Sequence, residues 1–235
     1  MKVIVTTGPS YEPIDEVRRI TNFSTGELGL MLANALARSG CEVFCLKGAY
    51  ATSPIPFAKG HLVGFTTNDD LHGKLVRLAG KHDIAALFHV AALCDYKVAR
   101  VEDERGARQS AAKIESRAGP LTLSLEPARK VIAGLREVFP RAVLVGWKYE
   151  LNGTRSDTLD KVWRQIRDCR TDACVVNGRA WGEGFGCCMP PDSVRELADK
   201  EAVVDFLWRW FQKRSGAAQA GAQTADNLGG TPIGT

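Results

Sequence analysis

The feature of this sequence that most constrains its fold is an alternation of short apolar runs with stretches of helical period. Residues 2–6 are rich in β-branched side chains and end in a turn containing Gly8 and Pro9, as expected of a buried strand. Similar runs follow at 42–46, 61–66, 83–91, 142–147 and 173–177, and helical periods lie between them at 27–39, 68–81, 128–138 and 157–169. This alternation predicts an α/β fold in which helices cover both faces of a mostly parallel sheet.

The composition predicts one globular domain with two additions. The chain of 235 residues is 45% hydrophobic and 25% charged, which suits a globular protein with a full core. We expect the domain to span residues 1–214. Within it, residues 97–120 are polar and show little periodicity, so we expect an exposed, mobile flap. Residues 215–235 carry almost no large apolar side chain, which predicts a disordered tail.

Several classes of protein are disfavoured. The longest apolar runs, such as 84–93, are much shorter than the ~20 residues that a membrane-spanning helix needs. The N-terminus lacks the pattern of a secretory signal, so we expect a cytoplasmic protein with no membrane partner. The seven cysteines are odd in number and lack paired metal-ligand spacing, which predicts free thiols and no metal site. A net charge of +4 is too weak to indicate nucleic acid, although it suits a small anionic substrate.

The loop after the first predicted strand is a candidate binding site. It spans residues 8–26, whereas such loops usually have about 2–6 residues. Ser24, Thr25 and Gly26 lie directly before a predicted helix, whose N-terminus would favour an anion. The alternative is that Ser24 or Thr25 only caps the helix. The dinucleotide fingerprint G-x-G-x-x-G is absent after this strand, which counts against a nicotinamide-dependent enzyme.

Other loops that follow predicted strands carry further candidates. Asp95 could accept a hydrogen bond or engage a cation, but it could also only open a turn. Glycines after the last two predicted strands, at 146, 178, 182, 184 and 186, suggest close approach of the backbone to a ligand. Lys113 lies in the predicted flap, where most lysines are simply solvated. His89 falls within an apolar strand, and we interpret it as a core histidine.

Six segments together resemble one enzyme family. They are VTTGPSYEPIDEVR with ITNFSTG at 5–26, AALCDY at 91–96, AKI at 112–114, VGWKYE at 145–150, VVN at 175–177 and GFG at 184–186. In this order and spacing, over about residues 1–212, the chain closely resembles the phosphopantothenoylcysteine synthetases of coenzyme A synthesis.

This resemblance implies a Rossmann-like fold and a two-step ligation. CTP or ATP would activate the carboxylate of 4′-phosphopantothenate as an acyl-nucleotidylate with release of pyrophosphate. The amine of cysteine would then displace the nucleotide and form an amide. Mg²⁺ and a homodimer are expected. Many bacterial relatives carry a flavin-dependent decarboxylase ahead of this segment; this sequence begins at the synthetase signature, so we expect no flavin.

The resemblance also implies roles for individual residues. Asn22 matches the asparagine that holds the activated acyl group, and Lys113 matches the flap lysine that completes the reaction; both would be catalytic. Nucleotide-binding positions are Gly8, Ala92, Asp95, Trp147 and Glu150. Substrate-binding positions are Ser24, Thr25, Gly26 and Asn177.

The chain departs from the bacterial family pattern at three places. Glu27 replaces a lysine that follows the Asn22 motif, Lys113 is the only lysine left of the Lys-x-Lys-Lys flap motif, and residues 126–129 read EPAR in place of Asn-Pro-Asp-Ile. Two alternatives therefore stay open. One is a non-catalytic relative that binds nucleotide or phosphopantothenate, and the other is an NAD(P)-dependent oxidoreductase.

Overall fold

The computed structural model describes residues 1–115, 117 and 119–228, and its centre is an eight-stranded sheet. Its strands are β1 (Lys2–Thr7), β4 (Glu42–Gly48), β5 (His61–Phe65), β6 (Ala86–His89), β9 (Val143–Tyr149), β10 (Ala173–Asn177), β11 (Phe185–Met189) and β12 (Ser193–Leu197), in the order β12-β11-β10-β9-β6-β1-β4-β5. The six strands from β5 to β10 pair in parallel, and β11 and β12 are antiparallel. The predicted α/β, Rossmann-like class is confirmed.

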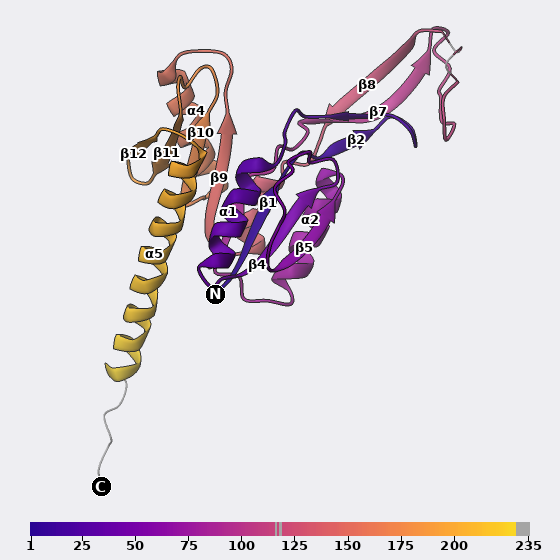
Figure 1. Cartoon of the computed structure of the whole chain (residues 1–235). Helices are drawn as coiled ribbons and strands as arrows, with labels where there is room; N and C mark the ends of the chain where they lie inside the picture. Colours follow the sequence, from indigo (N-terminus) through magenta and orange to yellow (C-terminus); the bar gives the residue numbers. More distant parts are fainter. Residues whose placement is uncertain (116, 118, 229–235) are drawn as a thin grey trace.

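Helices cover both faces of this sheet (Figure 1). Helices α1 (Glu27–Arg38) and α5 (Lys200–Leu228) lie on one face, against Val3 and Val5 of β1. On the other face lie α2 (Asn68–Ala79), the 3₁₀ helix η1 (Val131–Gly134), α3 (Leu135–Val138) and α4 (Arg155–Cys169). Because successive strand residues point to opposite faces, β1 buries apolar side chains on both sides, which explains its continuous apolar run.

The strand order reverses between β1 and β6. From β1 the chain first moves outward to β4 and β5, and then returns to place β6 on the other side of β1. In an open parallel sheet, the crevice at such a switch point is where ligands bind. The loops that border it here are residues 8–26, after β1, and residues 90–95, after β6.

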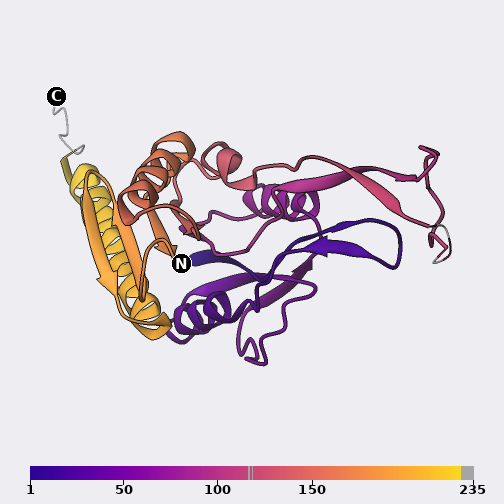
Figure 2. The ribbon, with the colours of Figure 1, turned by 90° about the horizontal axis from the view of Figure 1, so that it is seen from above.

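An extended arm projects from the body of the molecule (Figure 2). It combines a hairpin of β2 (Tyr11–Pro13) and β3 (Arg19–Thr21) with an antiparallel ribbon of β7 (Tyr96–Asp103) and β8 (Leu121–Pro127). The first part of the predicted flap at 97–120 is therefore a strand, because β7 pairs with β8 along its length. Local sequence does not predict this pairing. Its mobility stays a prediction, and residues 116 and 118 lie outside the described residues.

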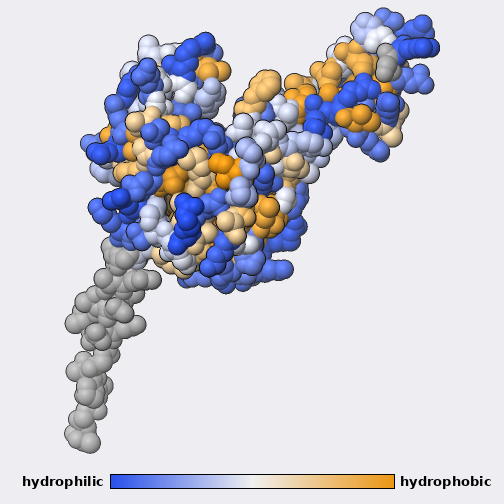
Figure 3. All heavy atoms as spheres, in the orientation of Figure 1, coloured by the Kyte–Doolittle hydropathy of each residue, from blue (hydrophilic) through white to orange (hydrophobic). Residues whose placement is uncertain are grey.

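The C-terminal segment also differs from the expectation. Helix α5 continues to Leu228, so residues 215–228, expected to be disordered, have helical backbone; several alanines and glutamines there favour a helix. Residues 229–235 lie outside the described residues. No helix within the described part of the chain is long and apolar enough to cross a bilayer. Apolar side chains do reach the surface along the arm, where Val17 and Leu125 are exposed (Figure 3).

Candidate active site

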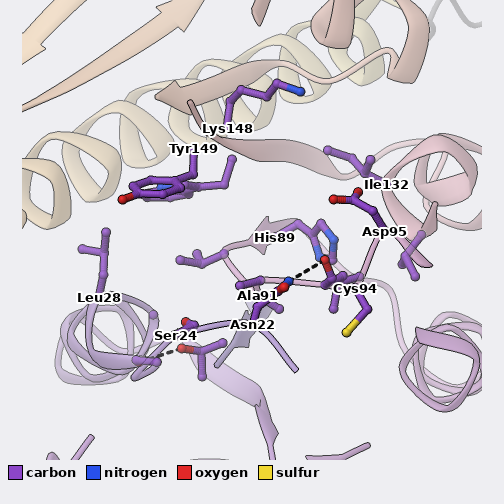
Figure 4. A pocket seen from close by; sticks show the side chains of 18 of the residues that line it. Asn22, Ser24, Leu28, His89, Ala91, Cys94, Asp95, Ile132, Lys148 and Tyr149 are labelled. Atoms are coloured by element: carbon purple, nitrogen blue, oxygen red, sulfur yellow. Dashed lines mark hydrogen bonds between the residues drawn. The ribbon is translucent and has the colours of Figure 1, made fainter. Parts of the chain in front are cut away.

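A cavity of about 1000 Å³ opens at the carboxyl ends of the central strands. Its walls come from the loop after β1, from the end of β6 with its following loop, and from the segment between β8 and η1 (Figure 4). Further lining residues come from the ends of β9 and β10, from α2, α4 and β11, and from Lys200, the first residue of α5. Sequence positions far apart thus meet at the switch point of the sheet, where the fold predicts a ligand.

Most of the residues expected from the sequence line this cavity. They are Asn22, Ser24, Thr25, Gly26, Ala92, Asp95, Trp147 and Asn177. Three of the expected residues, Gly8, Lys113 and Glu150, are not among its lining residues. The structure therefore brings Asn22 and Asp95 together, as the resemblance requires, and leaves Lys113 elsewhere.

Gly8 lies behind the cavity wall, in contact with Gly26. Gly8 and Gly26 both have positive φ angles, of 79° and 78°, and a Cβ on Gly26 would lie 3.1 Å from the Cα of Gly8. This close approach seats the start of α1 against the end of β1, and the Thr7 hydroxyl fixes it by donating to the Gly26 carbonyl at 2.7 Å. Gly8 therefore has a structural reason to be glycine.

The start of α1 is open to a ligand. The capping residue of the helix is Gly26, which has no side chain to satisfy the first-turn amides, so neither Ser24 nor Thr25 is the N-cap. The Thr25 hydroxyl accepts one hydrogen bond, from the Glu27 amide at 3.2 Å, and the Thr25 carbonyl accepts from the Ser53 amide at 2.9 Å. The remaining amides and the helix dipole favour an anion at this wall of the cavity.

Asn22 ties the two switch-point loops together. Its side-chain amide donates to the Leu93 carbonyl at 2.8 Å, so one of its two N–H groups is used and the other is left for a ligand. The loop of Asp95 is held further by the Cys94 amide, which donates to the Ser10 hydroxyl at 2.8 Å. These bonds fix the positions of Asn22 and Asp95 relative to each other.

Asn68, at the start of α2, clasps the same region from the opposite side. Its Nδ2 donates to the Cys94 carbonyl at 2.8 Å and to the Arg129 carbonyl at 3.0 Å. It thereby joins the loop after β6 to the segment after β8. Asn68 is buried and lines the cavity, and its Oδ1 has no partner among the described residues. Sequence patterns predict only a helix start at this position.

Positive charge predominates around the cavity. Its lining holds four basic side chains, from Arg129, Lys130, Lys148 and Lys200, and two acidic ones, from Glu27 and Asp95. Glu27, which departs from the family pattern, forms an ion pair with Lys200, so these two charges offset each other, and the remaining basic side chains of the lining outnumber its other carboxylate, Asp95. This balance suits phosphate groups.

Glu150 lies behind the wall and positions Lys148. Its carboxylate contacts Lys148 at 3.4 Å and Lys161 at 2.6 Å. Burial raises the pKa of Glu150, but the hydrogen bonds and charges of the two lysines outweigh it, so the net pKa is lowered and the group stays ionised. Glu150 therefore holds a cation at the cavity rather than facing it.

His89 lies at the end of β6, and its burial and hydrogen bond confirm the interpretation as a core histidine. The side chain is buried, with 6% exposed, and its Nδ1 is 2.9 Å from the Thr6 hydroxyl. Burial lowers the pKa of the imidazole to about 4, so it is uncharged at neutral pH. However, His89 also lines the cavity. The alternation of side chains along a strand shows which face of the sheet a residue lies on, but it does not show that a cavity borders that residue.

Lys113 lies on the arm, next to the β2–β3 hairpin. Its neighbours hold it there, because the Ala112 carbonyl accepts from the Glu16 amide at 2.9 Å and the Ile114 amide donates to Asp15 at 3.2 Å. Lys113 itself is exposed. Within the described residues, no group of three or more His, Cys, Asp or Glu side chains could hold a metal ion.

Comparison with known proteins finds a family model and several relatives that match this chain. The family model for the DNA/pantothenate metabolism flavoprotein C-terminal domain matches residues 1–202. The chain is 30% identical, over 225 residues, to the coenzyme A biosynthesis bifunctional protein CoaBC of Thermococcus kodakarensis, covering 90% of this chain and 51% of that protein. It is 27% identical to the Escherichia coli K12 protein of the same name, covering 73% of this chain and 41% of that one. The chain thus spans about half the length, or less, of these curated relatives.

Solved structures show the same fold. The DNA/pantothenate metabolism flavoprotein of Streptococcus pneumoniae superposes with a TM-score of 0.79 at 24% identity, covering 91% of this chain and 99% of that one. A Cab2 variant in complex with phosphopantothenate-cysteine superposes with a TM-score of 0.73 at 18% identity, covering 94% and 88%. The resemblance found in the sequence is confirmed, and the chain belongs to the family of the DNA/pantothenate metabolism flavoprotein C-terminal domain.

Proposed function

We propose that this protein is a phosphopantothenate–cysteine ligase. The observation that carries the proposal is the cavity at the β1–β6 switch point, which gathers Asn22, Asp95 and an open helix N-terminus under a mainly basic rim. The family membership supports it, as do curated relatives named for coenzyme A biosynthesis. A structural neighbour that holds phosphopantothenate-cysteine supports the choice of substrates.

The proposed reaction has two steps, activation of the carboxylate and formation of the amide. A carboxylate oxygen of 4′-phosphopantothenate attacks the α-phosphorus of a nucleoside triphosphate, forming an acyl-nucleotidylate and releasing pyrophosphate. The amine of cysteine then attacks the acyl carbon, loses a proton, and displaces the nucleoside monophosphate as the amide forms. Asn22 would donate its free N–H to the acyl oxygen, and the basic residues would bind the phosphates.

Mg²⁺ fits this site as a companion of the triphosphate. The metal prefers oxygen ligands and needs few from the protein when phosphates supply the rest. Asp95 would be its protein ligand, since the other carboxylate of the lining, Glu27, is paired with Lys200. When bound, Mg²⁺ would neutralise charge on the phosphates. The nucleotide would be CTP or ATP.

Lys113 would reach the reacting phosphates when the arm moves towards the cavity. A flexible ammonium group suits this task because it can follow the charge that develops on the leaving group. The homodimer, the cytoplasmic location and the absence of a flavin stay predictions. For the dimer, the exposed Val17 and Leu125 on the arm offer apolar surface that a second copy could cover.

A second candidate function is binding without ligation. It is favoured by the position of Lys113, which lies outside the cavity. Such a protein would bind nucleotide or phosphopantothenate and release no pyrophosphate.

One assay separates the two functions. The protein is incubated with 4′-phosphopantothenate, Mg²⁺ and either CTP or ATP, with and without cysteine, and pyrophosphate is followed. A ligase releases at most one equivalent of pyrophosphate per site without cysteine and turns over continuously with it. Nucleotide binding without pyrophosphate release would identify the binding protein and contradict the ligase.

A further inference from the structure

His89 presents one ring nitrogen to the cavity. Its Nδ1 faces the Thr6 hydroxyl, whereas its Nε2 has no hydrogen-bond partner in the part of the chain that the structure describes. Two fully buried side-chain polar atoms in this part of the chain have no hydrogen-bond partner, Asn68 Oδ1 and Thr171 Oγ1. His89 Nε2 is not one of them, so it is not fully buried. Since His89 lines the cavity, Nε2 has access to it.

The hydrogen-bond network determines which nitrogen carries the proton. The Thr6 hydroxyl accepts from the Ala91 amide at 3.3 Å, and its own hydrogen needs an acceptor because Thr6 is fully buried. His89 Nδ1, at 2.9 Å, is the acceptor that the described residues provide. A neutral imidazole that accepts at Nδ1 carries its hydrogen on Nε2. Nε2–H is therefore a donor that points to the cavity.

The surroundings of His89 indicate what kind of acceptor it takes. Its neighbours in the cavity wall include the apolar side chains of Val90, Ala91 and Ile132, while the lysines that suit phosphates, Lys148 and Lys200, come from β9 and α5. Figure 4 shows His89, Ile132 and Lys148 around the same opening. An uncharged donor in an apolar wall matches an uncharged acceptor on a flat, partly apolar group.

We infer that His89 Nε2–H donates to a ring nitrogen or carbonyl oxygen of the nucleotide base. This inference rests on the proposed function, because it assigns the base of the nucleotide co-substrate to this wall. Cytosine and adenine both carry such acceptors, so the inference holds for either nucleotide. Burial keeps the imidazole neutral at working pH, so that the donor is fixed on Nε2. His89 is thus a nucleotide-binding residue and not only part of the core.

The test compares binding of probes with and without a base. Dissociation constants for CTP, ATP, inorganic tripolyphosphate and 4′-phosphopantothenate are measured by calorimetry for the intact chain and for His89→Leu and His89→Gln. Removing the donor in His89→Leu should weaken binding of the preferred nucleotide roughly tenfold or more, as expected for a buried hydrogen bond. His89→Gln, which keeps an N–H at a similar reach, should recover part of it. Binding of tripolyphosphate and 4′-phosphopantothenate should not change.

Three results would overturn the inference. Unchanged nucleotide affinity in His89→Leu would show that His89 donates no hydrogen bond to the nucleotide. An equal loss of affinity for tripolyphosphate would show that His89 contacts the phosphates and not the base. An equal loss for all four probes would show a structural residue. If the intact chain turns over its substrates while His89→Leu binds nucleotide normally, only this inference fails. If the intact chain binds no nucleotide at all, the proposed function fails with it.

Discussion

Glu27, the first residue of α1, forms an ion pair with Lys200, the first residue of α5, although 173 positions separate them in the sequence. Both line the cavity. The pair places a cation beside the open start of α1, where the sequence alone shows an acidic residue. The negative charge of Glu27 therefore does not act alone on an anionic substrate.

This pair predicts opposite effects for its two members. Lys200→Met should raise the KM for an anionic substrate roughly tenfold, because a charge-assisted contact is lost and Glu27 is left unpaired. Glu27→Gln should lower that KM, since Lys200 becomes free to bind the anion. Steady-state kinetics check both. Arg209→Met is the matched control, because Arg209 pairs with Asp205 on the exposed side of α5. Equal behaviour of all three variants would contradict a role of the pair in substrate binding.

Asn22 provides a second prediction. In Asn22→Asp the N–H groups are lost, and a carboxylate faces both the Leu93 carbonyl and the developing negative charge of the acyl oxygen. We expect kcat to fall by roughly 10²–10³. Because Asn22 is exposed and loses one hydrogen bond, to the Leu93 carbonyl, the melting temperature should fall only slightly. Asn152→Asp, in an exposed loop, is the control. Full activity in Asn22→Asp would exclude Asn22 from acyl-group stabilisation.

The third prediction concerns Lys113 on the arm. Lys113→Gln should slow turnover roughly a hundredfold while leaving the nucleotide dissociation constant unchanged, because the ammonium acts only when the arm closes. Lys59→Gln, at an exposed position outside both arm and cavity, is the control. Single-turnover and binding measurements separate the two effects. An unaltered rate would remove Lys113 from the reaction.

Asp15 gives a prediction of pH dependence. Its desolvation raises its pKa, but hydrogen bonds from the Val17, Arg18 and Ile114 amides and the charge of Arg18 outweigh this, so its net pKa is lowered. The contact between the arm ribbon and the β2–β3 hairpin should therefore be intact above the usual aspartate pKa of about 3.9 and lost as pH falls through the lowered value. The protection factor of the buried Ile114 amide against hydrogen exchange reports this transition.

Asp15→Ala should abolish that transition and lower the Ile114 protection factor at neutral pH roughly tenfold, since the amide loses its acceptor. Asp103→Ala is the control, because Asp103 accepts from Arg105 and Ala107 within the turn of the arm. If the Ile114 amide stays protected in Asp15→Ala, the hydrogen bond from Ile114 to Asp15 is not what holds Lys113 and its neighbours against the hairpin.

The inner strands of the central sheet could be predicted from the sequence because they are buried on both faces. β1 and β6 appear as continuous apolar runs, and a loop as long as 8–26 after β1 already indicates a site. By contrast, the sequence patterns did not predict β2, β3, β7, β11 and β12. β12 is mostly exposed, so it lacks the apolar pattern of a buried strand. β11 is short and buried, but its glycines at 184 and 186 were interpreted as part of a ligand-binding loop.

Within the site, the order of motifs was enough to predict Asn22 and Asp95 but not the residues that act through tertiary contacts. Lys200 meets Glu27 only because α1 and α5 pack on the same face of the sheet. Glu150 was expected to contact nucleotide, but its contacts with Lys148 and Lys161 become visible only in three dimensions. His89 shows the same limit, since a strand pattern does not reveal what its ring nitrogens face.

In the proposed reaction, this cavity joins the carboxylate to a nucleotide before the amine attacks. An isotope experiment follows this step with 4′-phosphopantothenate labelled with ¹⁸O in its carboxylate, incubated with cysteine, Mg²⁺ and the preferred nucleotide. Acyl-nucleotidylate chemistry predicts one ¹⁸O atom in each nucleoside monophosphate released, visible as an isotope shift in the ³¹P spectrum. Label in inorganic phosphate, or amide formation without label in the monophosphate, would contradict the account.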